Sequence, residues 1–541
     1  MLNNNQNIFE HMDSNVKKRT LHIQFSNQSL NQHVYLHHIQ GKQALNQGIQ
    51  TVLLCLSEQI VIPVEQFIGS QVAVDCQIED GRYFRMSGIV MEAEQGHSDG
   101  HLTVYQLHVQ DPLALWKYRH NSRVFMAKSV VEIVEIIFSE WKKISPLFAS
   151  SLLLELKGLE KTYPIRPFTM QQQLSDEEFI KNLLRQEQIN FLIDEASAFV
   201  NHPSCRIEAQ RLCLIDDNKQ FAQLTRQNIT YQRSPYSIKD RIHCLVEHGA
   251  LVDMSWKKGA AQQNSDLEHL IVESSILIPE LKADVQGSKT EDMKLIQRYN
   301  KLGSDQRTET RQFVAYAHVD DAQVGCWFEL EGHPNIGVES STDRELLIIA
   351  QDFYKKNELT KVLDDQIMAL SKLSHWSYTA FIAYDSHPIT TLTLQLRSSL
   401  TVPEYNPVKH RVNARPQRAE VIGPIGEEVY VDEWGRIKVH FLLNSDQYST
   451  FTTSSVTKEK NAVWVNVLAP WASSYEGKQF LPKIGDIVVV DFFDGNIDQP
   501  FVVGRIHDGQ QIPIPVDIKA RLPDTQKLND NYIEEMKAAR A

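Results

Sequence analysis

Long apolar runs are missing from this chain. No stretch of its 541 residues approaches the roughly 20 consecutive apolar residues that a transmembrane helix requires. The N-terminal segment has neither the basic stretch nor the apolar core of a secretion signal. The sequence therefore predicts no stable membrane insertion and no export through a signal peptide, and it favours folding in the cytoplasm.

Cysteines are few and far apart. None of the 6 cysteines stands in Cys-x-x-Cys spacing, and they are Cys55, Cys76, Cys205, Cys213, Cys244 and Cys326. We predict that most are reduced, buried thiols of a protein that folds in the cytoplasm. The alternative is a disulfide framework or a zinc site.

Catalytic motifs are also missing. The sequence contains no Gly-x-Ser-x-Gly, no P-loop and no His-Glu-x-x-His. The carboxylate pairs Glu427-Glu428 and Asp432-Glu433 could serve glycoside hydrolysis, but the strands expected around them leave no room for a lysozyme-type insertion. We interpret them as solvated carboxylates in turns, and we predict no catalytic residue, no cofactor and no enzymatic activity.

Two patterns resemble metal sites superficially. Asp494, Asn496 and Asp498 have the spacing of the first three calcium-loop ligands, but the loop's glycine and final glutamate are replaced by Gln499 and Arg505. A hairpin turn is the better interpretation. His37 and His38 are adjacent on an expected strand, which would direct one to each face, one polar and one half-buried. The sequence therefore predicts no metal site.

The charge balance argues against nucleic-acid binding. The formal net charge is −13, and the segment 420–510 alone has 7 Lys/Arg against 13 Asp/Glu. Single-strand binding requires a basic groove with stacking aromatics. We therefore predict no nucleic-acid partner and assign Trp434, Trp464 and Trp471 to the core or to a subunit interface.

Strand patterns dominate what is present. Alternating β-branched and aromatic runs occur at 21–25, 52–56, 72–74, 83–86 and 102–109, with turns at 79–81 and 98–100. Two helices are expected after capping boxes that begin at Ser129 and Ser175, and a third over 359–373. The fold class predicted is mainly β with α+β parts.

The order of these patterns predicts several domains, because single cores rarely exceed about 250–300 residues. The predicted ranges are an N-terminal tail (1–19), a first β-barrel (20–111), an α+β domain (112–201), a second β-barrel (202–380) with an insertion at about 251–312, a proline-containing linker (381–419), an OB-fold module (420–510) and a C-terminal tail (511–541). Strands around 211–214 are assigned to the second barrel.

The OB-fold module is predicted from five short strands in fewer than a hundred residues. They are expected at 429–431, 437–441, 463–467, 487–493 and 501–503, separated by turns such as 432–435 and 494–496. A small closed barrel suits them because closure removes exposed sheet edges.

This segment resembles the OB module of the VgrG family, the spike proteins of bacterial type VI secretion, which are related to contractile phage-tail hubs. The matching residues are Gly423-Pro424, Gly426-Glu427-Glu428, Tyr430, Asp432-Glu433, Gly435-Arg436, Lys438, Phe441, Trp464, Pro470-Trp471, Gln479 to Pro482, Ile484-Gly485, Val490 to Phe492, Asp494-Gly495, Asp498, Pro500 and Gly504-Arg505. The resemblance extends upstream through Asp111-Pro112, Asn121 to Phe125, Tyr163 to Arg166, Glu177 to Ile180 and Phe328 to Pro334.

The resemblance implies a role and partners. It implies two tube-forming barrels per subunit, a homotrimer, and contacts with a tube-forming (Hcp-like) ring protein, baseplate proteins, and effectors or adaptors. Cytoplasmic assembly and then secretion by the injection machine are expected, with a phage or prophage tail hub as the alternative. The family's β-helical needle is not recognisable after residue 507, so trimer association is expected to be weaker, and a tip-capping PAAR-type partner is expected only where a needle is present.

Overall fold

The computed structural model describes residues 20–58, 61–78, 81–203, 206–231, 241–248, 312–317, 319–334, 336, 344–376, 390–403, 410, 413–443, 462–468 and 481–506. Among these residues no helix is both long enough and apolar enough to cross a membrane. The predicted tails, most of the predicted insertion, Cys205 and Trp471 lie outside the described residues. The chain divides into two compact units, of which the second consists of 121–128, 166–173 and 411–541.

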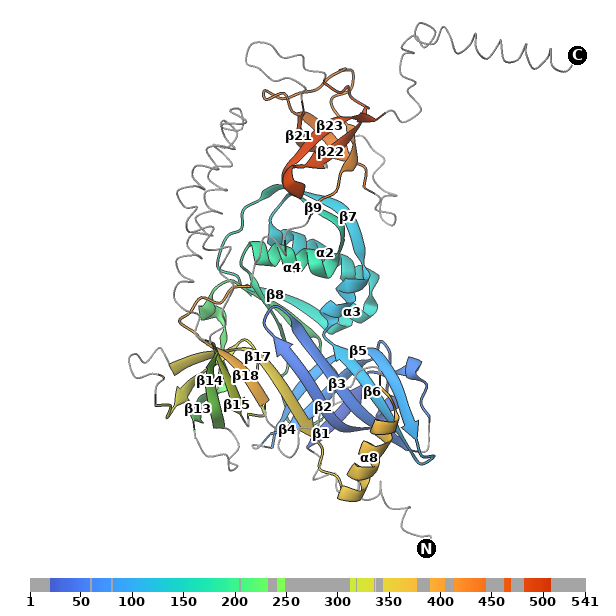
Figure 1. Cartoon of the computed structure of the whole chain (residues 1–541), viewed down its shortest axis with the longest axis vertical. Helices are drawn as coiled ribbons and strands as arrows, with labels where there is room; N and C mark the ends of the chain where they lie inside the picture. Colours follow the sequence, from blue (N-terminus) through green and yellow to red (C-terminus); the bar gives the residue numbers. More distant parts are fainter. Residues whose placement is uncertain are drawn as a thin grey trace, which may run out of the picture. The chain divides into compact units, whose positions relative to one another are not determined.

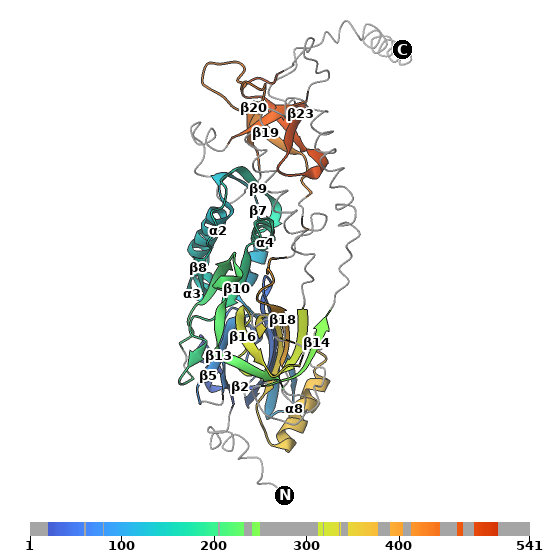
Figure 2. The same cartoon turned by 90° about the vertical axis from the view of Figure 1, so that its left-hand side faces the viewer.

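The first unit is built on a 13-stranded sheet (Figures 1 and 2). Its first half runs in the order β1 (Leu21–Phe25), β4 (Gln71–Gln77), β5 (Tyr83–Ser98), β6 (Leu102–Gln110), β3 (Gly48–Glu58) and β2 (Val34–Ala44). These strands surround one apolar core, which includes Phe25, Phe67 and Tyr105. The predicted first-barrel strands are present, and β2 contains the strand that was expected at His37 and His38.

Strand β17 (Glu345–Lys356) belongs to two cores at once. Its second half, from Ala350 onward, pairs with β2, and Phe353 packs into the first core. Its first half pairs with β16 (Cys326–Glu331) and β18 (Thr390–Leu396) around a second core containing Leu346–Ile348. A bulge between Ile348 and Ala350 marks the change.

The second core lies inside a ring of strands. From β16 the pairings continue through β13 (Ala222–Tyr231), β14 (Arg241–His248) and β15 (Gln312–Ala317) to β18, which pairs back with β17. The prediction of a mainly β fold with hub barrels is confirmed. The stretch 381–419, expected to be a linker because of its prolines, contains β18 and also β19 (Gln417–Val421).

Asn357 follows β17 and fixes the N-terminal strand. Its Oδ1 accepts from Leu21 N at 2.9 Å, and its Nδ2 donates to Leu21 O and Leu36 O at 3.0 and 2.9 Å. Helix α8 (Lys361–Leu373) then covers Leu54, Leu56, Leu102 and Val104 of β3 and β6 with its own apolar face. This helix confirms the one predicted over 359–373.

A helical layer and a small sheet complete the first unit. Helix α2 (Val130–Ile144) begins at a complete capping box between Ser129 and Glu132, as predicted, and α4 (Asp176–Gln186) begins at Ser175, whose Oγ accepts from Glu178 N. The short helix α3 (Pro146–Ser151) follows α2, and the small sheet has the order β10 (Asn190–Asp194), β12 (Gln210–Ile215), β8 (Leu152–Gly158). Strand β12, which the sequence analysis assigned to the second barrel, therefore pairs with β10 and β8, because strand patterning does not specify the partner.

The second unit contains the predicted closed five-stranded barrel. Its order is β19, β20 (Ile437–Phe441), β21 (Val463–Val467), β23 (Pro500–Ile506), β22 (Ile487–Phe492). The segment 429–431, predicted as the first strand, forms only one bridge, Val431 to Ile437, and β19 takes its place. Strand β19 was not predicted because Ala419 and Val421 are its only buried apolar residues.

A two-stranded ribbon belongs to the same unit as this barrel. It consists of β7 (His120–Lys128) and β9 (Arg166–Ser175), and Met170 lies in the barrel's apolar core. Val124, Met126 and Phe168 pack against that core. Gln172 and the backbone of Arg415 exchange two hydrogen bonds of 2.9 Å. The unit is thus assembled from three separate chain segments.

Candidate functional site: buried polar clusters of the hub and an exposed face of the OB barrel

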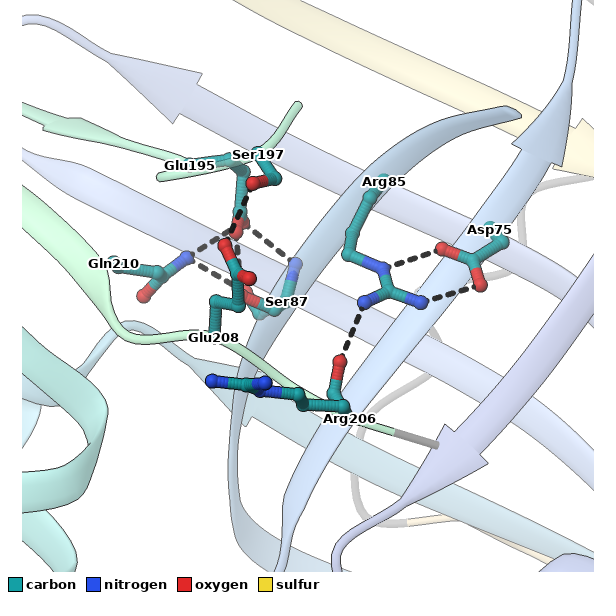
Figure 3. Close-up of polar contacts among 8 residues, drawn as sticks. All are labelled: Asp75, Arg85, Ser87, Glu195, Ser197, Arg206, Glu208 and Gln210. Atoms are coloured by element: carbon teal, nitrogen blue, oxygen red, sulfur yellow. Dashed lines mark hydrogen bonds and ion pairs between the residues drawn. The ribbon is translucent and has the colours of Figure 1, made fainter. Parts of the chain in front are cut away.

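A buried ion pair belongs to a polar network of the first unit (Figure 3). Arg85 Nε and Nη2 donate to the two carboxylate oxygens of Asp75 at 2.7 and 2.8 Å, and both side chains are almost fully buried. Arg85 Nη1 donates to the backbone oxygen of Arg206 at 2.8 Å. The hydrogen bonds to Asp75 raise the pKa of the Arg85 guanidinium, so this group stays charged.

Glu195 forms the other half of this network. Its Oε1 accepts from Ser87 N at 2.7 Å and from Gln210 Nε2 at 2.8 Å, while its Oε2 accepts from Ser87 Oγ at 2.7 Å (Figure 3). Burial raises the pKa of the Glu195 carboxyl, and the hydrogen bonds from Ser87 and Gln210 oppose that shift. Nearby, Ser197 Oγ donates to Glu208 Oε2 at 2.6 Å.

These contacts attach Glu195 and Gln210, and the backbone of Arg206, to β5. The short strand β11 (Phe199–Val200) pairs with Phe84 and Tyr83 at the same place. Every polar group of Glu195 and Asp75 is directed at a protein donor, which leaves neither carboxylate open to a substrate. The arrangement is that of a structural clamp between the barrel and the segment leading into β12.

The two adjacent histidines correct a prediction. A bulge between Leu36 and His38 interrupts the strand's alternation, so both imidazoles are buried, at 0% and 2% exposure, instead of one being half-exposed. Their Nδ1 atoms lie 2.8 Å apart, and His37 Nε2 lies 2.8 Å from Asp364 Oδ1 on α8. Burial lowers the pKa of both imidazoles, which are therefore neutral at pH 7.

A single proton arrangement satisfies these contacts. Neutral His37 donates from Nε2 to Asp364, and its Nδ1 then accepts from the Nδ1–H of His38. Lys356 Nζ contacts the second oxygen of Asp364 at 2.5 Å. The cluster thus fixes α8 on the sheet. No group of three or more His, Cys, Asp or Glu able to hold a metal occurs in the part of the chain that the structure describes.

A buried lysine stands against a buried thiol. Lys355 Nζ lies 3.4 Å from Cys76 Sγ and donates to Asp320 O at 2.7 Å, with Asp320 Oδ1 at 3.5 Å. These acceptors raise the pKa of Lys355 against the effect of burial. The described cysteines are free thiols: Cys55, Cys76, Cys213 and Cys326.

The carboxylates of the OB module that the sequence suggested as possible site residues lie in turns. Asp432 accepts from Trp434 N and Arg436 N at 3.0 and 2.8 Å, and Gly435 has a φ of 74°. Glu428 is exposed and pairs with Lys483. Asn496 Oδ1 accepts from Asp498 N at 3.3 Å, as in a turn, and the side chain of Asp494 lies outside the described residues. The structure does not bring these carboxylates into one site.

Apolar side chains are exposed on the OB barrel. Trp434 is 45% exposed and Ile425 is 96% exposed, so Trp434 does not belong to the core. Trp464 is partly buried beside Tyr430, with ring centroids 5.2 Å apart. Further exposed apolar residues of the barrel are Val429, Val431, Leu468, Phe493, Val503 and Ile506.

Two family models match the chain, one in the first unit and one in the barrel of the second unit. The phage tail baseplate hub (GPD) model matches residues 42–252, and the type VI secretion system/phage-baseplate injector OB domain model matches residues 422–507. The type VI secretion system spike protein VgrG1b of Pseudomonas aeruginosa is 23% identical over 507 residues, which cover 90% of this chain. VgrG3 of Vibrio cholerae is 25% identical over 475 residues, or 82% of this chain.

The chain is similar to VgrG-type spike proteins over most of its length. It spans 60% of the length of VgrG1b and 40% of the length of VgrG3. It also spans 35% of a Vibrio cholerae relative named actin cross-linking toxin VgrG1, with 26% identity. The hub and OB parts are therefore shared, while these relatives are longer.

Solved structures share this VgrG-type fold. The E. coli c3393 protein, a type VI secretion component with structural similarity to the T4 tail proteins gp27 and gp5, has a TM-score of 0.55 at 14% identity, covering 87% of this chain and 97% of its own. A chain of the half-lidded Francisella PdpA-VgrG complex has a TM-score of 0.50 at 11% identity, covering 95% and 86%. At these sequence identities, both similarities show a shared fold.

The buried clusters could not be predicted from motifs. Asp75 and Arg85 are 10 positions apart and are brought together by the pairing of β4 with β5. Glu195 and Ser87 are 108 positions apart and are brought together by tertiary packing. One sequence signal for the ion pair is a charged residue within a strand. Asp75 and Arg85 each interrupt an otherwise apolar run, and a buried charge requires a partner.

Proposed function

We propose that this chain is a structural hub and spike component of a type VI secretion machine, acting as a homotrimer at the tip of the secreted tube. The observation that carries the proposal is the presence, in one chain and in this order, of a hub module and an injector OB module. Neither module alone would support it, because an OB barrel serves many functions.

The surface properties support assembly with other proteins. The OB barrel exposes Trp434 and Ile425, whose burial between subunits would stabilise a trimer. We propose a tube-forming Hcp-like ring, baseplate proteins, and effectors or adaptors as further partners, with a PAAR-type tip protein only where a needle is present. The net charge of −13 disfavours nucleic acid. Cytoplasmic assembly followed by secretion through the machine completes the proposal.

We propose further that this chain is not an enzyme. The buried carboxylate of Glu195 and the imidazole of His37 are held by protein donors and acceptors. We do not attribute to this chain the actin cross-linking activity named for one relative, because the match covers 35% of that protein. Turnover of cell wall, nucleic acid or lipid that one polar substitution abolishes would contradict this.

Deleting the gene from its bacterium tests the secretion role. We expect that release of the tube ring protein into the medium stops and that the wild-type gene restores it, measured by immunoblot. Unchanged release would contradict the proposal. Recovery of the protein in purified phage particles, with normal release of the ring protein, would instead establish the tail-hub function suggested by the hub model's description.

Light scattering across a dilution series tests the trimer. We expect a trimer that dissociates on dilution, and Trp434→Asp should shift dissociation to higher concentration, whereas Lys483→Gln on the same barrel should not, since it removes only an exposed ion pair. A monomer at every concentration would contradict the homotrimer.

A further inference from the structure

Helix α8 covers a pair of buried histidines as well as apolar side chains. The strand register places His38 directly opposite Leu54, so the two side chains lie on the same face of the sheet. Leu54 belongs to the apolar cluster that β3 and β6 form with α8, and His37 contacts Asp364 of α8 directly. The bulge in β2 therefore puts both imidazoles under this helix.

The charges that act on the two imidazoles come from β17 and α8. Lys356 of β17 is the register partner of His38, and its Nζ contacts Asp364. Burial raises the pKa of the Asp364 carboxyl, but hydrogen bonds from Lys356 and His37 lower it by more, so Asp364 stays ionised. The neutral imidazoles thus lie beside one cation and one carboxylate, and each added proton gives the cluster an excess positive charge.

Tyr354 of β17 is the remaining titratable neighbour named by the contacts of His38. The two ring centroids lie 5.3 Å apart. Burial raises the pKa of the Tyr354 phenol to about 12, so it is uncharged at neutral and acidic pH. It cannot balance a proton taken up by the histidines.

The geometry of the pair accepts one added proton but not two. His37 Nε2 carries a proton because it donates to the carboxylate of Asp364. After a first protonation, His37 can donate from both ring nitrogens, provided that neutral His38 accepts at Nδ1. A second proton would put an N–H on each Nδ1, and two N–H groups cannot face each other across 2.8 Å. The two imidazoles must then separate.

Movement of α8 would make room for this separation. We propose that α8 is a proton-controlled cover, which leaves the sheet when both imidazoles are protonated and exposes the apolar face formed by Leu54, Leu56, Leu102 and Val104. The inference goes beyond the spike function and does not depend on it.

The direction of the pH effect follows from proton binding. Burial lowers the pKa of both imidazoles, whereas solvated imidazoles have the ordinary pKa of 6.5, so the released state binds protons more readily. As the pH falls below 6.5, release becomes about 10- to 100-fold more favourable per pH unit, for one or two protons taken up. The cover is therefore closed at neutral pH and opens in acid.

Hydrogen exchange of the full chain, measured by mass spectrometry, tests the release. Protection factors at pH 7 and pH 5, corrected for the pH dependence of intrinsic exchange, are compared for a peptide covering 361–373 and one covering β4. We expect the protection of 361–373 to fall at least about tenfold at pH 5 and to lie at least about tenfold below that of β4. An unchanged protection of 361–373 would overturn the proposal. Equal protection of the two peptides at pH 5 would also overturn it, because the helix would then open only when the whole unit unfolds.

A double variant tests the assignment to the histidines. His37→Gln/His38→Gln removes both titrating groups, so the protection of 361–373 should differ less than about twofold between pH 7 and pH 5. The control is His97→Gln, at an exposed histidine whose backbone N–H donates to Ser374 just after α8, and it should behave as the wild type. A wild-type pH dependence in the double variant would overturn the proposal.

A second variant leaves the histidines unchanged. Asp364→Ala removes the carboxylate that binds His37 and Lys356, so the protection of 361–373 should fall at least about tenfold already at pH 7. Asp365→Ala, at the exposed neighbouring position of the same helix, should change it less than about twofold. Full protection in Asp364→Ala would show that the cluster does not hold the helix, and the proposal would fail.

Discussion

Two substitutions of Glu195 distinguish the contribution of its hydrogen bonds to stability from the contribution of its negative charge. Glu195→Ala leaves Ser87 N–H, the Ser87 hydroxyl and one Gln210 amide N–H without their acceptor. At about 1–3 kcal/mol for each buried polar group left unpaired, and with water entering the space, we expect a loss of about 3–5 kcal/mol in the free energy of unfolding. Glu195→Gln can still accept from Ser87 N and donate to Ser87 Oγ, so its loss should be about 1 kcal/mol or less.

The pH dependence has a definite sign. Because burial raises the folded-state pKa of Glu195, the folded state favours the protonated carboxyl more than the unfolded state does. The stability that this adds is fully present below the unfolded pKa of about 4.3 and is lost as pH rises through the folded pKa. The wild type should therefore lose stability relative to Glu195→Gln as pH rises from 4 toward neutrality.

Thermal unfolding followed by circular dichroism measures both effects. At pH 7 we expect Glu195→Ala to melt roughly 10 °C below the wild type and Glu195→Gln within about 3 °C of it. If the two variants lost the same stability, the charge and not the hydrogen bonding would dominate. If neither lost any, the clamp on β5 would contribute nothing and the argument from its geometry would fail.

Three further outcomes are expected from the turn, the asparagine clamp and the histidine pair. Gly435→Val should destabilise the OB barrel by about 1–3 kcal/mol because Gly435 has a φ of 74°, whereas Glu433→Ala in the same turn should be neutral; urea unfolding compares them. Asn357→Ala should cost about 2–4 kcal/mol and raise amide exchange in the first strand, seen by mass spectrometry. Since burial lowers the pKa of His37 and His38, the stability of the fold should fall as pH drops below about 6.5. Thermal unfolding measured across pH should show a smaller pH dependence in His38→Asn. An unchanged pH dependence would contradict the assignment of this effect to the histidine pair.

Local patterns predicted local structure well. The capping box at Ser129 and Glu132 is present, and the strand 437–441 was predicted to the residue. These features depend on neighbours within a few positions, and their periodicity and side-chain chemistry are visible in the sequence. The turn at Gly435 belongs to the same class, because positive φ favours glycine.

Non-local pairing was harder to predict. The alternation of 210–215 indicated a strand but not its partners, β10 and β8. His37 and His38 were expected on opposite faces, and a one-residue bulge buried both. The clamp at Glu195 requires β5 and the 195–210 segment to meet, which depends on tertiary packing and not on spacing.

The assembly of the second unit from three segments limits how its barrel can be exchanged. The chain crosses between the two units at 120/121, 128/129, 165/166, 173/174 and 410/411. A fragment that begins at 411 would leave behind Met170 and the ribbon that covers the barrel, so it should be prone to aggregation. A recombination event or an engineered chimera that replaces this barrel must therefore carry the matching ribbon from the same parent. Pulling on the barrel would also load five covalent connections in parallel, where a single linker would offer one.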